Sequence, residues 1–262
     1  MNAVTYDDLG HPVAMARRPE RVISLVPSLT EAIAASAPDL LAGATDWCTH
    51  PADLAVPRFG GTKNPTVAQI VAAEPDLVIA NEEENKPEHV AELRAAGVPV
   101  WVTDIRDVPT ALTSLGRLLD LLDVGPRDRG WHDAAVAAWT DPEPVRPGQR
   151  LTALVPIWRK PWMALGRDTY AGDVLARLGV DHVLTADPDR YPRIDPAQVA
   201  RHTPYQLVIL PDEPYRFTAA DGPEAFEVPA ALVDGRALTW YGPAMADAPQ
   251  ILRAAIRAAV AP

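Results

Sequence analysis

The chain has 262 residues, of which 48% are apolar and 23% charged, and its formal net charge is −11. This length exceeds that of one small module, so we expect two lobes of roughly 120 residues each. The acidic balance, with no basic stripe, argues against a nucleic-acid partner, because a phosphate backbone would be repelled. The single cysteine, Cys48, excludes an intrachain disulfide and a zinc site built only on thiolates.

The sequence also bears on location. No apolar run approaches the roughly 18 residues of a membrane span, so we do not expect the chain to cross a membrane. The segment Met1 to Leu9 has neither the basic region nor the apolar region of a secretory signal. As written, the sequence predicts a cytoplasmic protein, and the alternative is an exported mature domain whose signal is not part of it.

The first half reads as alternating strands and helices. The apolar run Arg21 to Val26 predicts a strand, and Ser28 to Glu31 fits a capping box that opens a helix over Leu29 to Ala37. A second strand over Leu40 to Thr45 is followed by a long polar loop, 46–64. The remaining predicted elements are a helix from Pro65 or Thr66 that ends before Pro75, a strand over 77–80, a helix over 87–96 and a strand over 98–103. This alternation predicts a parallel sheet covered by helices on both faces.

Two further helices and a linker complete the first half. Leucines at helical spacing predict an amphipathic helix over 108–122, and a second helix is expected over 127–139. The segment 141–148 has three prolines and few groups to bury, which suits a connection between lobes. The predicted division is an N-terminal lobe over 1–125, a connecting helix and linker over 126–149, and a C-terminal lobe over 150–262.

A faint internal repeat supports two similar lobes. The run Arg150 to Pro156 repeats Arg21 to Pro27 at an offset of 129, and Gln206 to Ile209 repeats Asp76 to Ile79 at an offset of 130. Open α/β sheets bind ligands outside the carboxyl ends of their strands. We therefore expect two Rossmann-like α/β lobes with parallel sheets that enclose a ligand cleft lined by loops after strands.

Tryptophans follow several predicted strands. The chain has seven Trp and six Tyr but three Phe. Trp47 follows the second strand, and Trp158 and Trp162 follow the first strand of the second half beside Arg159. Large aromatics are mostly buried, so a core role for each is the simpler interpretation. Three of them in loops after strands favour a pocket in which indoles stack on a flat ligand and Arg159 pairs with an anionic group.

Two acidic groups occupy matching positions in the halves. Glu82, Glu83 and Glu84 follow one strand, and Asp212 and Glu213 follow its repeat. Such runs are usually solvated loops. Their equivalence favours the alternative that they are symmetric contacts to a partner with two basic sockets.

Cys48 and His50 could ligate a soft or borderline metal. A buried, inert Cys48 and a hydrogen-bonded His50 are the simpler alternative. The motifs of hydrolases, zinc proteases, P-loop proteins and dinucleotide-binding proteins are missing from the sequence. A binding function therefore fits better than catalysis, and we expect no catalytic residue and no catalytic cofactor.

Three motifs resemble one known family. Arg18 to Glu31 (RPERVISLVPSLTE), Gly60 to Pro65 (GGTKNP) and Pro75 to Ile79 (PDLVI) are similar to the substrate-binding proteins of ABC importers for vitamin B12 and ferric siderophores, the helical-backbone metal receptor superfamily. The resemblance implies two α/β lobes joined by one rigid interdomain helix, a metal chelate between them, and one acidic residue per lobe presented to the permease. Glu82 or Glu83, together with Glu213, match those acidic positions.

The leading hypothesis is a monomeric, non-enzymatic receptor for a cobalamin-like corrinoid, a ferric siderophore or haem, with delivery to an ABC permease. The alternative is a cytoplasmic, chelatase-like enzyme or chaperone of metal-tetrapyrrole metabolism. The candidate ligand-binding residues are Trp47, Arg58, Lys63, Trp158, Arg159, Trp162, Tyr191 and Tyr215.

Overall fold

The computed structural model describes residues 4–15, 17–140, 148 and 150–261. The packing divides them into two compact units. The first unit is Met1–Ile105, Thr110–Asp133 and Tyr241–Pro243, and the second is Arg106–Pro109, Ala134–Trp240 and Ala244–Pro262. Most of the predicted linker 141–148 lies outside the described residues. The division into an N-terminal lobe over 1–125, a connection over 126–149 and a C-terminal lobe over 150–262, as separately folding parts, stays a prediction.

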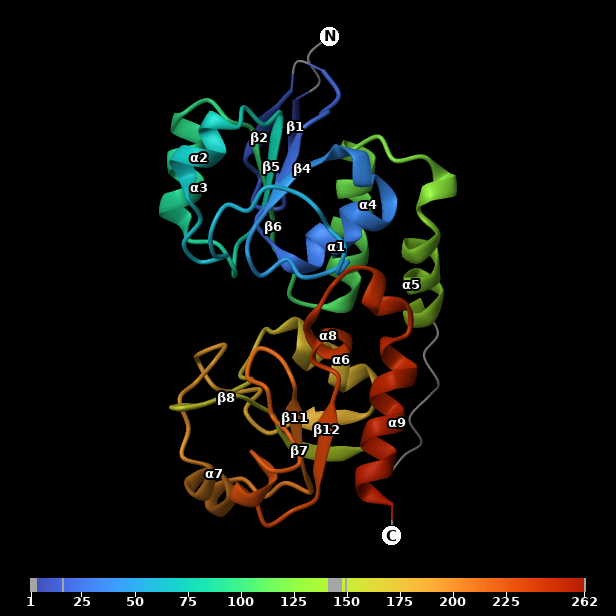
Figure 1. The fold of residues 1–262 in the computed structure, drawn as a ribbon. Helices are drawn as coiled ribbons and strands as arrows, with labels where there is room; N and C mark the ends of the chain where they lie inside the picture. The colour runs from blue at the N-terminus through green and yellow to red at the C-terminus, as the bar shows by residue number, and fades with distance from the viewer. Residues whose placement is uncertain (1–3, 16, 141–147, 149, 262) are drawn as a thin grey trace. The chain divides into compact units, whose positions relative to one another are not determined.

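The first unit holds a four-stranded parallel sheet in the order β4-β3-β5-β6 and a small antiparallel pair, β1-β2 (Figure 1). Its strands are β1 (Val4–Tyr6), β2 (Pro12–Ala14), β3 (Val22–Ser24), β4 (Leu41–Ala44), β5 (Leu77–Asn81) and β6 (Val100–Thr103). Its helices are α1 (Pro27–Ser36), η1 (Pro38–Leu40), α2 (Val67–Ala72), α3 (Pro87–Ala95), α4 (Val108–Leu121), whose first two residues belong to the second unit, and η2 (Pro126–Asp128). Helix α5 (Gly130–Thr140) runs from the first unit into the second. Helices α2 and α3 cover one face of the sheet, and α1 and α4 cover the other.

The second unit repeats this plan, with a parallel sheet in the order β10-β7-β11-β12. Its strands are β7 (Leu151–Leu154), β8 (Pro156–Arg159), β9 (Trp162–Ala164), β10 (Val180–His182), β11 (Leu207–Pro211) and β12 (Ala230–Val233). Its helices are α6 (Tyr170–Arg177), α7 (Pro196–His202), η3 (Pro223–Ala225), α8 (Gly235–Thr239), η4 (Pro243–Ala246), which begins in the first unit, and α9 (Ala248–Val260). The equivalence of β3 with β7 and of β5 with β11 gives both sheets one strand order, so the predicted α/β fold with two parallel-sheet lobes is confirmed.

Burial explains why these segments form strands. Every residue of β3, β5, β6 and β11 is buried, as expected for parallel strands covered on both faces. In α4, Leu115, Leu118 and Leu119 are almost fully buried, which confirms the predicted leucine stripe. These layers hold the loops at the carboxyl ends of the strands.

The predicted start of the first helix is wrong. Helix α1 begins at Pro27, its N-cap is Val26, and no side chain caps it. Proline is favoured at a first helical position because its missing N–H would have no intrahelical partner there. The hydroxyl of Thr30 donates instead to the Val26 carbonyl at 2.9 Å.

Candidate functional site

Trp158 and Trp162 lie on a short antiparallel hairpin of the second unit. The sequence predicts them in a loop after β7, but Trp158 belongs to β8 and Trp162 to β9. The prediction of a loop is wrong because the chain pairs with itself across Lys160 and Pro161 and forms two strands too short for a clear alternating pattern.

Five aromatic side chains form a cluster at this hairpin. The indole of Trp158 meets the ring of Tyr215 edge to face, with centroids 5.6 Å apart. Trp162 stacks on Phe217 at 5.9 Å and meets Phe226 edge-on at 5.5 Å. Phe217 is buried, whereas the side chain of Trp158 is the outer member, since 41% of that residue is exposed. The cluster is therefore a supported aromatic surface with one indole presented to solvent.

Arg159 lies beneath this surface and has protein partners. Its guanidinium carbon is 5.3 Å from the centroid of the Trp162 ring. Its nitrogens form ion pairs with Asp221 and with Glu224. The hydroxyl of Tyr215 donates to Asp221 at 2.6 Å, so Arg159, Asp221 and Tyr215 form one network that positions the cluster.

The charges in this network stabilise one another. The hydrogen bond to Glu224 raises the pKa of Arg159, and the hydrogen bond from Tyr215 lowers the pKa of Asp221. The backbone N–H of Gly222 donates to Glu224 at 2.6 Å and lowers the pKa of that carboxyl. The network therefore holds one positive and two negative charges at neutral pH.

Tyr191 lies in a segment that runs beside β9. The N–H of Ile194 donates to the Trp162 carbonyl at 3.0 Å, and the N–H of Ala164 donates to the Pro192 carbonyl at 3.1 Å. The guanidinium of Arg190 stands 5.9 Å from the centroid of the Tyr191 ring. Tyr191 is thus joined through the backbone to the strand that carries Trp162.

In the first unit, Trp47 stands on the loop after β4, and 67% of that residue is exposed. Arg58 pins the base of this loop, because its guanidinium donates to the carbonyls of Thr45, Cys48 and Leu54 at 2.9, 2.8 and 3.0 Å. The loop is therefore held from inside while its tryptophan faces solvent.

Cys48 is buried under this loop. Its sulfur is 3.1 Å from the hydroxyls of both Thr30 and Thr45, and burial raises the pKa of the thiol. The Nδ1 atom of His50 is 3.2 Å from the Thr49 hydroxyl. Among the described residues, no group of three or more His, Cys, Asp or Glu is placed to hold a metal ion. A contact of Cys48 or His50 with the metal of a bound chelate stays a prediction.

The acidic loop after β5 is built on Asn81. Its side-chain oxygen accepts hydrogen bonds from the N–H groups of Glu83 and Glu84 at 2.9 and 3.1 Å. The Lys63 ammonium donates to the Glu83 carbonyl, and Glu82 is exposed at the loop surface. The backbone of this loop is thereby fixed independently of its carboxylates.

A consecutive pair, Trp240 and Tyr241, contacts one acidic residue in each unit. Within the first unit, the Tyr241 hydroxyl donates to Glu84 at 3.0 Å, and burial raises the pKa of Glu84 to about 7. Within the second unit, the Trp240 indole N–H donates to Glu213 at 3.0 Å, and burial raises the pKa of Glu213.

The sequence reasoning missed several of these residues. Asp221, Glu224 and Phe226 carry no motif, and they meet the hairpin only through folding. Asn81 was detectable in principle, because a short polar side chain directly after a buried strand is typical of a residue that bonds its own loop.

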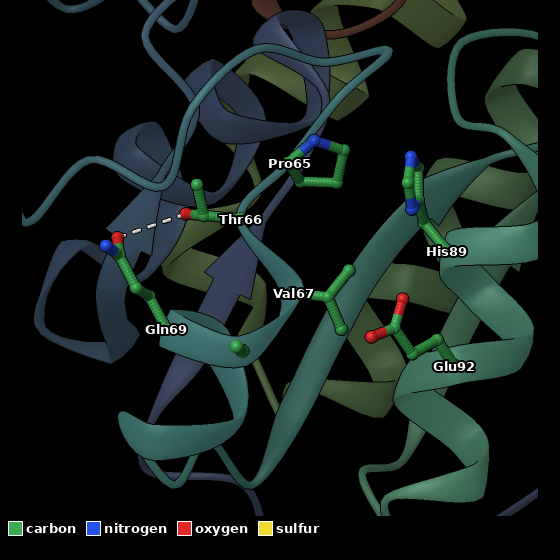
Figure 2. A pocket seen from close by; sticks show the side chains of 7 residues that line it. Pro65, Thr66, Val67, Gln69, His89 and Glu92 are labelled. Atoms are coloured by element: carbon green, nitrogen blue, oxygen red, sulfur yellow. Dashed lines mark hydrogen bonds between the residues drawn. The ribbon is translucent and has the colours of Figure 1, made fainter.

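A separate cavity of about 340 Å³ lies between the segment that begins α2 and helix α3 (Figure 2). His89 and Glu92 face it from α3, and the Thr66 hydroxyl donates to Gln69 at its edge at 3.1 Å. The remaining lining residues are Pro65, Val67 and Ala68. None of the predicted ligand-binding residues lines this cavity.

In the part of the chain that the structure describes, no helix has the length and apolar character needed to cross a membrane.

No protein-family model matches the chain. A vitamin B12-binding protein of Yersinia pestis (strain Pestoides F) is 26% identical over 249 residues, which cover 92% of this chain and 85% of that protein. A vitamin B12-binding protein of Pectobacterium carotovorum is 21% identical over 196 residues, which cover 73% of this chain and 71% of that protein. The resemblance that the three sequence motifs predict is therefore confirmed along most of the chain.

Solved structures share the fold. The periplasmic vitamin B12 binding protein BtuF of Vibrio cholerae matches with a TM-score of 0.74 at 17% identity, covering 94% of this chain and 99% of that one. The heme binding protein HmuT matches with a TM-score of 0.75 at 19% identity, covering 98% and 89%. The periplasmic heme-binding protein BhuT, solved with two hemes, matches with a TM-score of 0.70 at 22% identity, covering 92% and 99%. These matches show the fold.

Proposed function

We propose that this chain, which resembles importer-type substrate-binding proteins, binds a flat metal chelate such as a corrinoid or haem and performs no chemistry on it. The observation that carries the proposal is the exposed indole of Trp158 on a supported aromatic cluster. Stacking on one aromatic face is worth roughly 1 to 3 kcal/mol, by analogy with nucleobases. The names of the relatives agree with such a ligand.

The proposed ligand contacts are Trp158, Trp162, Tyr191 and Tyr215 in the second unit and Trp47 in the first. Arg58, Arg159 and Lys63 are proposed to act mainly by holding loops, since each of them contacts oxygen atoms of the protein itself. That the two sets of residues line one cleft stays a prediction.

We further propose an exported protein that delivers its ligand, as a monomer, to an ABC permease. BtuF and BhuT are periplasmic proteins, which favours the exported alternative over the predicted cytoplasmic location. Glu82, Glu83 and Glu213 are the proposed docking residues. The fixed backbone under Glu83 would hold the base of this side chain in one place on the loop.

The relatives are named as binding proteins, and none of those named above is an enzyme. The chelatase-like alternative therefore has no support from them. It would require turnover, whereas the proposed receptor would return its ligand unchanged.

The test is titration of the purified protein with cyanocobalamin and with haemin, followed by tryptophan fluorescence and visible absorption. Binding should quench part of the fluorescence and shift the absorption band of the ligand in a saturable way. Incubation with a metal-free porphyrin and Fe²⁺ or Co²⁺ should give no metallated product above a protein-free control. Failure of both chelates to bind, or protein-dependent metallation, would refute the proposal.

A further inference from the structure

The charge around the aromatic cluster bears on which chelates it can accept. The hairpin 156–164 and the loop 211–228 together carry five carboxylates and three cations. The carboxylates belong to Asp212, Glu213, Asp221, Glu224 and Glu227. These two segments together therefore carry two more carboxylates than cations.

The cation that lies over the Trp162 ring is already paired. Arg159 keeps only 20% of its side chain exposed and forms ion pairs with both Asp221 and Glu224. A guanidinium presents a fixed fork of donors that suits two carboxylate partners. A third carboxylate, brought by a ligand, would have to displace one of these partners and would face the remaining negative charge.

Resting on the proposed function, we propose that Asp221 and Glu224 select against anionic chelates, so that the ligand of this surface is a neutral or cationic metal chelate. Both carboxylates belong to the network that positions Tyr215 and Trp162, within the cluster that would receive the chelate. Selection therefore operates where the ligand would bind. The hydrogen bonds that these carboxylates accept lower the pKa of each, so the charge persists at mildly acidic pH.

The test uses two ligands with the same macrocycle, iron protoporphyrin IX and its dimethyl ester, in which methyl groups mask two carboxylates; the salt series separates the effect of charge from that of the added methyl groups. Fluorescence titration of the wild-type protein should give a tighter dissociation constant for the ester, by about 3- to 10-fold at low salt, because like charges repel weakly through water. At about 1 M salt the two constants should converge, since screening acts over roughly 3 Å.

The matched variants change charge and retain shape. Asp221→Asn with Glu224→Gln leaves an acceptor for the Tyr215 hydroxyl and one for the Gly222 N–H. This double variant should abolish or invert the preference for the ester, because Arg159 becomes free to pair with a propionate. Glu227→Gln removes one carboxylate of the same loop outside the Arg159 network, and it should keep most of the preference.

Two results would overturn the inference: wild-type protein that binds the free acid as tightly as the ester at low salt, or a folded double variant that keeps the wild-type preference. The salt series on wild-type protein decides the question even where the double variant does not fold. If neither porphyrin nor cyanocobalamin binds, the proposed function fails instead, and that result is distinct from loss of selectivity.

Discussion

Truncation of Trp158 to alanine separates a binding role of this side chain from a structural one. Trp158 keeps 41% of its surface exposed, and its ring meets that of Tyr215 edge to face. Removing that edge-to-face contact costs about 0.5 to 1.5 kcal/mol of stability. We therefore expect Trp158→Ala to lower the free energy of unfolding by about 1 to 2 kcal/mol, well short of the roughly 3 to 5 kcal/mol typical of a buried Trp.

Trp158→Ala should affect the binding of a flat chelate more strongly than it affects the stability of the fold. Loss of stacking worth roughly 1 to 3 kcal/mol weakens the dissociation constant of a flat chelate by about 5- to 150-fold. Denaturant unfolding and fluorescence titration of the same preparation measure both quantities. Trp131→Phe is the matched control, because Trp131 belongs to none of the predicted sites and its indole N–H donates to Ser36.

The reasoning fails if Trp158→Ala destabilises the fold by 3 kcal/mol or more while the dissociation constant stays within twofold of wild type. That pattern would make Trp158 a core residue. An equal loss of affinity in Trp131→Phe would show that the assay responds to tryptophan content and not to the cluster.

Three other measurements test the remaining assignments. Trp162→Ala should lose about 3 kcal/mol of unfolding free energy as well as affinity in the same two assays, because Trp162 stacks on Phe217 and meets Phe226 edge-on. Glu84 has a folded-state pKa of about 7, above its ordinary value of 4.5, so its protonation adds stability that is fully present below about pH 4.5 and lost as the pH rises through 7. Glu84→Gln should therefore be more stable than wild type at pH 8 in urea unfolding and should flatten the pH dependence between 4.5 and 7. A double variant, Glu83→Lys with Glu213→Lys, should abolish stimulation of permease ATPase and leave the affinity for cyanocobalamin, which has no net charge, unchanged, whereas equal loss of that affinity would place these residues in the ligand site.

The scaffold was predictable because its signals are local. The runs that became β3, β5 and β11 are short, apolar and bounded by breakers, so each can be recognised without knowledge of its partners. The offset between the two copies then predicted their equivalence, and both sheets have the same strand order. This prediction of the scaffold did not depend on knowing which side chains, far apart in the sequence, contact one another in the fold.

The candidate site was only partly predictable, because its contacts join residues far apart in the sequence. Arg159 meets Asp221 62 residues later, and Glu84 meets Tyr241 157 residues later. Composition and spacing indicated that Arg159 could pair with an anionic group of a ligand and that Glu84 could contact a basic partner. They could not indicate that Arg159 is already neutralised by two carboxylates, which changes its expected role from ligand contact to support of the aromatic cluster.

The candidate residues concentrate where the internal repeat breaks down. In the first unit, the polar stretch after β4 carries Trp47, and in the second unit, the hairpin after β7 carries Trp158. The equivalent places in the other copy differ: β3 leads almost directly into α1, and the segment 183–195 that follows β10 is shorter than the segment 45–66 that follows β4 and carries Tyr191. The two sheets have the same strand order, so their edges are similar. The segments that follow the strands differ, so each unit presents different side chains at its sheet edge. Selectivity of this protein should therefore change through substitutions in 46–64, 156–164 and 211–228, while substitutions in β3, β5, β7 and β11 should act on stability.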